Sequence, residues 1–339
     1  MAETILHCEH CDCELPREDD NFGDDEITLC RSCFRAHYTR CSNCDRVISV
    51  DAAFYLNSDN EDDPLCSTCY EEAQRCEGIL SYYFNPVPIF YGDGPRYFGV
   101  ELEIDRAGEI TRNARELLSI ANGDQTRIYC KHDGSLDDGF EIVSHPMSLH
   151  YHQFHMPWAE IMAKAVQMGY RSHQANTCGI HVHVSRAAFG PDESTQDIVI
   201  ARILYFFEKH WEELLKFSRR TPRQLDRWAA RYGYKEHPGD ILAYAKKGYG
   251  PGRYVCVNLQ NTDTIEFRIF RGSLIVNTMM ATLQLVDRIC DVALALSDED
   301  LKGMSWSTFV AGCTQPELVQ YLKERRLYVN EPVEAKEEL

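Results

Sequence analysis

Residues 178–185 read CGIHVHVS, and this stretch is the first indication of the fold class. Valine and isoleucine favour β-strands, and a strand points successive side chains to opposite faces. On a strand, His181, His183 and Ser185 would share one face, and the other face would be apolar. Two imidazoles on one face are either satisfied core histidines or part of a polar site. Other segments of the chain decide between these two interpretations.

A second predicted strand carries carboxylates in the same way. Residues 97–106 read YFGVELEIDR, so Glu101, Glu103 and Asp105 face away from three apolar side chains. Two glutamates two positions apart repel each other unless something positive lies between them. A hard divalent cation is the natural candidate.

Two further predicted strands repeat this arrangement. The short strand FEIVS carries Glu141, and Asp133 lies eight residues before it, across a turn. Residues 253–272 predict a hairpin with the turn QNTD, and its second strand has Glu266 and Arg268 on the polar face. Four such strands in one antiparallel sheet would form a concave, charged face. Carboxylates, imidazoles and an arginine suit divalent metal and a nucleoside triphosphate, so we assign the histidines to a site.

Helices are predicted between and after these strands. One follows Pro157, a long one covers about 193–219, and another covers about 277–297. Residues 222–250 are predicted to be helical and then loop-like, ending in the glycine-rich AKKGYGPGR, which lacks P-loop spacing and is either a flexible loop or a flap over phosphates. The predicted fold class is α+β.

Composition excludes several kinds of protein. The 339 residues suffice for about two domains, and a formal net charge of −18 argues against general nucleic-acid binding. No apolar run is long enough for a membrane span, and the N-terminus MAETILHCEHCDC lacks the features of a secretory signal. We therefore expect a cytoplasmic protein.

Ten of the 15 cysteines lie in residues 1–80, and eight of them form four Cys-x-x-Cys pairs. In a cytosolic chain this pattern predicts zinc rather than disulfides. The simplest pairing is sequential and predicts two structural zinc sites, held by Cys8, Cys11, Cys30 and Cys33, and by Cys41, Cys44, Cys66 and Cys69. An interleaved pairing stays open. The spare donors, which could replace a thiolate, are His10, Cys13, His37 and Cys76.

The chain is thus divided into four parts. Residues 1–80 resemble a pair of zinc-ribbon or LIM-like units, 81–96 form a linker, 97–325 form the second domain, and 326–339 are expected to be a disordered acidic tail. The first part is either a structural clip or a docking module. Its 19 acidic and 6 basic residues favour a neutral or basic partner surface.

The motifs FGVELEID, DGS…EIVS, GIHVHVS and TIEFRIFRGS resemble the glutamine synthetase-like carboxylate–amine ligases, and most closely the amidoligase family of bacteria and their phages. The resemblance covers roughly residues 95–300. It implies a curved antiparallel sheet with flanking helices, ATP, and two or three Mg²⁺ or Mn²⁺ ions.

The resemblance also implies roles for individual residues. The implied metal ligands are Glu101, Glu103, Asp133, Glu141, His181 and Glu266, where Asp133 replaces the family's usual glutamate. Nucleotide or phosphate contacts are implied for His183, Ser185 and Arg268, and as weaker candidates for Arg253 and Arg271. Substrate contacts are implied for Asn176 and Gly179. The implied catalytic set is Glu101, Glu103, Glu141, His181, Glu266 and Arg268.

The implied chemistry is ATP-dependent formation of an amide or isopeptide bond through an acyl phosphate, on an amino-acid, peptide or protein substrate. No match to the glutamine synthetase ammonia loop is present, so a larger amine is favoured over ammonia. The zinc module would then select a macromolecular substrate or partner, and a neighbouring subunit could complete the site. The rival interpretations are a guanidino-kinase-like phosphotransferase, a metal-dependent hydrolase, and a non-catalytic adaptor built around the zinc module.

Overall fold

The fold is described from a computed structural model, which defines residues 6–15, 21–55, 64–71, 78–248 and 252–328. The chain divides into two compact units, Met1–Leu80 and Ser81–Leu339. Cys76, residues 249–251 of the glycine-rich stretch, and the tail from residue 329 onward lie outside the described residues.

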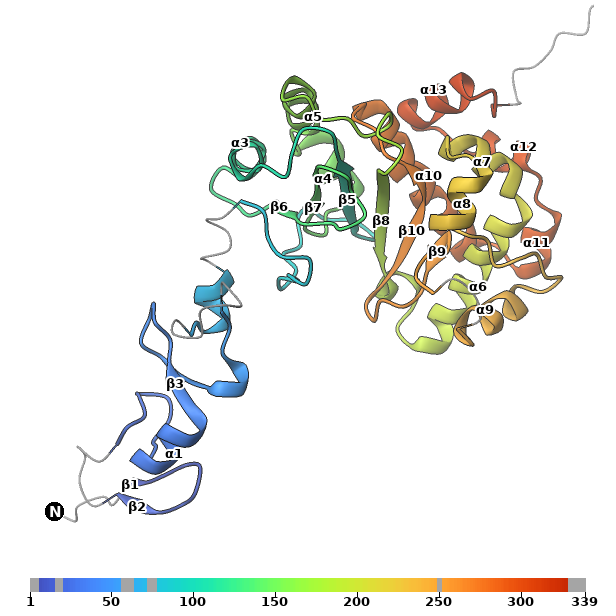
Figure 1. Ribbon diagram of the computed structural model, residues 1–339. Coiled ribbons are helices and arrows are strands. Elements are labelled where there is room, and N and C mark those ends of the chain that lie inside the picture. The colour runs from blue at the N-terminus through green and yellow to red at the C-terminus, as the bar shows by residue number, and fades with distance from the viewer. Residues whose placement is uncertain (1–5, 16–20, 56–63, 72–77, 249–251, 329–339) are drawn as a thin grey trace, which may run out of the picture. The chain divides into compact units, whose positions relative to one another are not determined.

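The second unit is built on a six-stranded sheet in which every strand runs antiparallel to its neighbours (Figure 1). In spatial order its strands are β6 (Ile128–Lys131), β7 (Phe140–Ser144), β5 (Phe98–Ile104), β8 (Gly179–Ser185), β10 (Thr264–Arg271) and β9 (Val257–Asn258). The predicted α+β class is confirmed, and all four predicted strands pair in one sheet.

The alternation expected from the sequence is what gives this sheet a dry face. Val100, Leu102 and Ile104 of β5 are fully buried, as are Ile180 and Val182 of β8. The long helix α10 (Val276–Ala295) contacts β8 as well as α4, α5, α6 and α13, and its predicted position is confirmed. Burial of this apolar surface holds the opposite, polar face of the strands in place.

The remaining helices surround the sheet (Figure 1). They are α3 (Thr111–Asn122), α4 (Leu149–Phe154), α5 (Trp158–Gln167), α6 (Glu193–Lys209), α7 (Trp211–Ser218), α8 (Pro222–Trp228), α9 (Pro238–Lys246), α11 (Asp298–Gly303), α12 (Trp306–Ala311) and α13 (Pro316–Glu324), with the 3-10 turn η3 (Arg186–Phe189). The single long helix predicted over 193–219 is wrong, because His210 leaves the helical conformation and separates α6 from α7. Its ring is buried against Phe206 and Trp306.

One irregularity in β10 matters for the site. Phe267 pairs with Val182, but Phe270 pairs with Ile180, so β10 holds one extra residue between them, a β-bulge. The bulge shifts the alternation, and Arg271 pairs with Gly179, on the face that carries His181. Without it, Arg271 would point to the dry face.

The first unit has short elements and little core. They include β1 (Leu6–His7), β2 (Glu14–Leu15), α1 (Arg31–His37), β3 (Tyr38–Arg40), β4 (Val47–Ser49) and the 3-10 turn η2 (Val50–Ala52). Its two buried clusters are Cys8, Leu29, Cys33 and Val47, and Cys41, Leu65, Cys66 and Cys69. Cysteines therefore provide much of its interior.

Candidate functional site

The polar face of the sheet brings the predicted acidic and imidazole side chains together. Glu101 of β5 pairs with His181 of β8, and Glu266 of β10 pairs with His183. On the other side of β5, Glu103 pairs with Glu141 of β7. Directly paired residues of antiparallel strands have neighbouring side chains on one face, so the register alone assembles the site.

Three of these side chains form what we call the Glu101 group, defined as Glu101, His183 and Glu266. One possible ligand atom from each lies within 4.8 Å of the others. His183 Nε2 is 3.1 Å from Glu101 Oε1, and His183 Nδ1 is 3.2 Å from Thr264 Oγ1. Asn258 Nδ2 donates to Glu266 Oε2 at 2.8 Å and fixes that carboxylate from β9.

A second set of three, the Glu141 group, consists of Glu103, Asp133 and Glu141, again with one oxygen from each within 4.8 Å of the others. His181 lies between the two groups. Its Nδ1 is 2.9 Å from Glu101 and 3.6 Å from Glu266, and its Nε2 is 3.6 Å from Glu103.

The site holds several buried carboxylates close together, and their pKa values are shifted. Burial raises the pKa of Glu101, but His183 and His181 outweigh it, so this pKa lies well below its usual range. Burial raises the pKa of Glu141 well above its usual value, and the Glu101 carboxylate adds to the rise. Burial also raises the pKa of Glu103. A bound cation would relieve this crowding, because a positive charge stabilises the ionised carboxylates.

These side chains line a cavity of about 430 Å³, which we call the central cavity. The predicted site residues in its lining are Glu101, Glu103, Asp133, Glu141, His181, His183, Arg253, Glu266 and Arg268. The predicted residues outside its lining are Asn176, Gly179, Ser185 and Arg271. Arg271 instead donates to the Asn176 side chain at 3.0 Å.

Gly179 lies close to two side chains of the site. A Cβ atom at this position would lie 2.5 Å from Arg220 Nη2 and 2.8 Å from His181 Nε2. Such separations are far below van der Waals contact, so the glycine lets Arg220 lie against the strand. A larger residue here would displace the tip of the Arg220 side chain.

Sequence reasoning missed several residues of the cavity. Arg220 is buried in the loop between α7 and α8, and its Nε and Nη2 each donate to Phe270 O at 3.2 Å. Lys131 lies 3.6 Å from Glu141, and Asn258 holds Glu266. Asn258 pairs with Glu266 in the observed hairpin, whereas the predicted turn QNTD would place it opposite Ile265. Arg220 had no signal in the sequence, since no predicted strand carries it.

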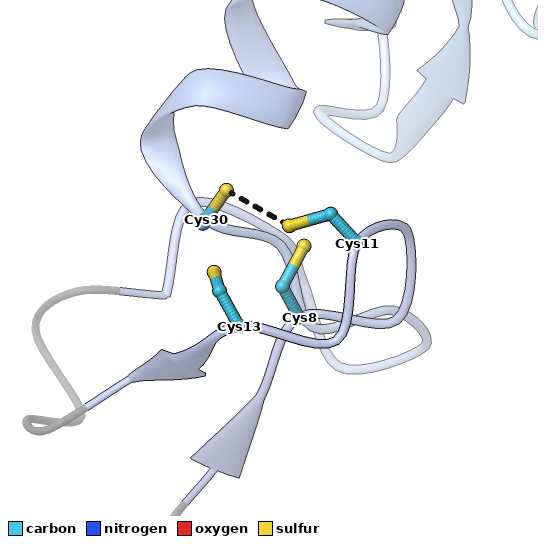
Figure 2. A group of neighbouring side chains, drawn as sticks. All are labelled: Cys8, Cys11, Cys13 and Cys30. Carbon is cyan, nitrogen blue, oxygen red and sulfur yellow. Dashed lines mark hydrogen bonds between the residues drawn. The ribbon is translucent and has the colours of Figure 1, made fainter.

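The cysteines of the first unit form two clusters. One consists of Cys41, Cys44, Cys66 and Cys69, the set predicted for one zinc. In the other, Cys8, Cys11, Cys13 and Cys30 point toward one another (Figure 2), and the predicted ligand Cys33 is buried beside Cys8 in the same cluster, so the structure brings both Cys13 and Cys33 to this group. The Cys11 and Cys30 sulfurs are 3.8 Å apart, and those of Cys44 and Cys66 are 3.7 Å apart. Zinc–sulfur bonds of about 2.3 Å give a tetrahedral edge of about 3.8 Å, so the donor sets fit Zn²⁺.

Comparison with protein families identifies the family of this chain. Residues 119–290, just over half of the chain, match the model of a family described as "Putative amidoligase enzyme". The chain belongs to this amidoligase family. The matched segment of this amidoligase includes β7, β8 and β10, but β5 with Glu101 and Glu103 lies before it.

Solved structures provide distant similarities to the amidoligase. A bifunctional glutathione synthetase from Pasteurella multocida is 12% identical with a TM-score of 0.40, over 68% of this chain and 46% of that chain. The prokaryotic ubiquitin-like protein Pup in complex with its ligase PafA gives 8% identity and a TM-score of 0.33, over 69% of this chain and 62% of that chain. The amidoligase thus spans less than two thirds of either chain. No curated protein sequence matches it.

The length and composition of the helices bear on whether one of them could cross a membrane. Among the described residues, no helix combines the length and apolar character that crossing a bilayer requires.

Proposed function

We propose that this amidoligase is an ATP-dependent carboxylate–amine ligase that works through an acyl phosphate. The observation that carries the proposal is the central cavity. Two sets of three metal-binding side chains meet there around His181, with arginines in the same lining. This combination suits phosphoryl transfer, which depends on positioning and on neutralising charge.

The Glu101 and Glu141 groups would hold divalent cations. Their donors are mainly carboxylate oxygens, the ligands that Mg²⁺ and Mn²⁺ prefer. Burial, with neighbouring carboxylates, raises the pKa values of Glu103 and Glu141, and a bound cation would offset both effects. Bound cations would neutralise the phosphate oxygens of ATP. His181 contacts carboxylates of both groups and would keep their spacing fixed.

Arg268 is the best candidate for a phosphate contact. Its Nη1 contacts Glu266, while its Nε is buried and has no hydrogen-bond partner among the described residues. Buried donors are normally satisfied, so this N–H is available to an acceptor in the cavity. Arg253, which contacts Tyr82 and lies 5.1 Å from the Tyr254 ring centroid, would provide a second positive charge.

A neighbouring cavity of about 600 Å³ would take the nucleotide base, and we call it the aromatic cavity. Tyr82, Phe84 and Tyr129 line it together with prolines. It shares Glu101 and His183 with the central cavity. A flat base stacks well on aromatic rings, so a base in this cavity would lead its phosphates toward Arg268.

The reaction would proceed in two steps. A carboxylate oxygen of the substrate attacks the γ-phosphorus of ATP, the bond to the β-γ bridging oxygen breaks, and ADP leaves. The nitrogen of an amine then attacks the acyl carbon, phosphate leaves with the C–O bond electrons, and the amine loses a proton to a base. Arg268 would stabilise charge on the transferring group in the first step.

The first unit would contribute recognition. It contains 19 acidic and 6 basic residues, and its fold depends on two cysteine clusters rather than on a large core. We infer that it docks a protein or peptide substrate with a neutral or basic surface. The wild-type chain should then ligate such a peptide faster than a single amino acid at the same concentration.

The test is product analysis with Mg-ATP and a panel of amino acids and peptides. A product lighter by one water than its two reactants, formed with ADP and phosphate, would support the ligase. Glu266→Gln should lower the rate by about 10²–10³-fold, because it removes a charge from the centre of the site. Glu160→Gln, an exposed carboxylate on α5, should change nothing.

Two results would contradict the proposal. A product heavier by one phosphoryl group would identify a phosphotransferase instead. Absence of thermal stabilisation by Mg-ATP in a folded protein would exclude nucleotide chemistry at this cavity.

A further inference from the structure

Asp105 is the member of the acidic run Glu101, Glu103 and Asp105 that the central cavity does not use. Its side chain is fully buried and does not line the cavity, whereas the two glutamates do. Within the part of the chain that the structure describes, Asp105 forms no ion pair at 4.0 Å or less. A buried carboxylate without a cation is costly unless hydrogen bonds replace its lost hydration. Its contacts therefore indicate what this residue does.

Four hydrogen bonds end on the Asp105 carboxylate. Its Oδ1 accepts from Arg106 N and from Asp138 N, both at 2.7 Å. Its Oδ2 accepts from Asp137 N at 3.2 Å and from Thr177 Oγ1 at 2.5 Å. We call these five residues the Asp105 network. The network joins three segments that are distant in the sequence, namely the end of β5, the loop between β6 and β7, and the loop that precedes β8.

The loop between β6 and β7 carries a predicted metal ligand. Asp133 in this loop belongs to the Glu141 group, and both Asp133 and Ser135 line the central cavity. At the start of the loop, Ser135 N donates to Asp133 Oδ1 at 2.7 Å. At its end, two backbone amides donate to Asp105. Because the loop is short, its attachment to Asp105 determines where the Asp133 carboxylate lies.

The backbone beside the network is strained. Arg106 and Asn176 have φ angles of 81° and 69°, which non-glycine residues rarely adopt. Arg106 belongs to the network, and Asn176 directly precedes Thr177, which also belongs to it. The Arg106 side chain adds a further link, because its Nη2 donates to Ala175 O at 3.0 Å. Strain of this kind persists only where the surrounding structure enforces it, and it is concentrated at functional sites.

The position of Asp105 requires a carboxylate. Each of its two oxygens accepts a hydrogen bond from at least one backbone N–H, and an ionised aspartate offers acceptors only. An asparagine would fill the same space. Whichever way its amide were turned, however, its NH₂ group would face a backbone N–H of the network. Asp105→Asn should therefore release the loop with little change in volume.

We propose that Asp105 is a positioning residue for a divalent cation in the Glu141 group, and that it acts through the backbone of the loop that carries Asp133. This inference rests on the proposed function, because it takes the Glu141 group as a cation site. Asp105 itself would contact neither the cation nor the substrate. Its loss should therefore weaken the binding of one cation and leave the Glu101 group, on the other side of His181, unchanged.

The test is manganese binding to the zinc-loaded full chain, with free Mn²⁺ measured by electron paramagnetic resonance. Glu141→Gln and Glu266→Gln show which binding step belongs to which group. Asp105→Asn should weaken the step that is lost in Glu141→Gln by about 10–100-fold, the usual cost of removing a residue that orients a metal ligand, and should leave the other step within about twofold. Asp124→Asn, at an exposed position in the loop before β6, is the matched control and should bind like the wild type.

A double variant separates positioning from general damage to the fold. If Asp105 acts through Asp133, then Asp105→Asn should weaken binding by less than about twofold when Asp133→Asn is already present. General damage would instead retain its full effect in that background. Thr177→Val is a milder variant, which decides the question if Asp105→Asn does not fold. It removes one hydrogen bond of the network, and we expect a loss of about 2–10-fold in the same binding step.

The inference is overturned if manganese affinity is unchanged in both Asp105→Asn and Thr177→Val, or if both binding steps weaken equally. An undiminished effect of Asp105→Asn in the Asp133→Asn protein would also overturn it. A wild-type chain that binds no manganese would contradict both this inference and the cation sites of the proposed function. Product formation from Mg-ATP is measured separately. Its absence, with the manganese results as expected, would count against the ligase reaction and not against the role of Asp105.

Discussion

The two units of this amidoligase obtain their stability from different sources. In the first unit, strands of two or three residues surround buried clusters that consist largely of cysteine. In the second, a six-stranded sheet buries whole strands, and its largest fully buried side chains are aromatic. A small core cannot offset the entropy of ordering a chain, and the proposed metal–thiolate bonds would supply what apolar burial supplies in the second unit. The two units should therefore fail under different treatments.

Zinc removal should have the largest effect. Structural zinc contributes on the order of 10 kcal/mol to folding, so chelation should unfold residues 6–55 and 64–71. The second unit has its own core and should stay folded. Hydrogen exchange measured by mass spectrometry, with and without chelator, checks both expectations. If the amides of the first unit stay protected from exchange in zinc-free protein, the two units do not differ in the source of their stability.

A cavity in the sheet should produce the reverse pattern. Phe267 of β10 is fully buried, with its ring centroid 5.6 Å from that of Phe207. Phe267→Ala should lower the free energy of unfolding of the second unit by about 3–5 kcal/mol, measured by denaturant titration. Phe154→Ala, at a residue that is 65% exposed, is the control and should cost little. Zinc content should be unchanged in both variants.

Mild acid should weaken the second unit through a buried histidine. Burial lowers the pKa of His152 to about 4, with a smaller opposing effect from its hydrogen bond to Phe98 O. The unfolded chain binds this proton near pH 6.5, before the folded protein does. Stability is therefore full above pH 6.5 and falls as the pH drops toward 4, by about 3 kcal/mol for this one residue.

Variants isolate that effect. His152→Gln should flatten the fall in unfolding free energy between pH 6.5 and 4, whereas His150→Gln, at an exposed position, should leave it unchanged. Equal pH profiles for wild type and His152→Gln would show that the imidazole stays uncharged for another reason or does not contribute.

The smallest effect concerns a single ligand of the first unit. Cys8 and Cys13 are opposed at the end of the β1–β2 pair, with Cys8 N donating to Cys13 O at 2.9 Å. Cys13 is exposed, so only a bound metal could protect its thiol. If Cys13 is the fourth ligand, zinc should slow its alkylation at least tenfold, and Cys33→Ser should still bind two zinc ions. Fast alkylation of Cys13 in zinc-loaded protein would restore the predicted set with Cys33.

Patterns with a fixed period were predictable from the sequence. The alternation of side chains along each strand predicted that Glu101, Glu103, His181 and His183 share one face. The pairing between the strands then brings these side chains together. Features that depend on a single added or displaced residue were not predictable. The bulge before Phe270 and the break at His210 interrupt runs whose composition is continuous on both sides.

Contacts between distant loops were also beyond sequence reasoning. Arg220 reaches the site because Gly179, far away in the chain, leaves room for it. Cys13 was treated as a spare donor because it lies outside the Cys-x-x-Cys spacing, although the β1–β2 pair turns it toward Cys8.

The position of β5 in the sheet limits where the chain can be truncated. β5 lies between β7 and β8, yet it precedes the segment that identifies the family. A fragment starting at residue 119 would leave β7 and β8 as two unpaired edges in the middle of the sheet, exposed to pairing with other chains. The part of the sequence that is easiest to recognise is therefore not a part that can be expressed alone.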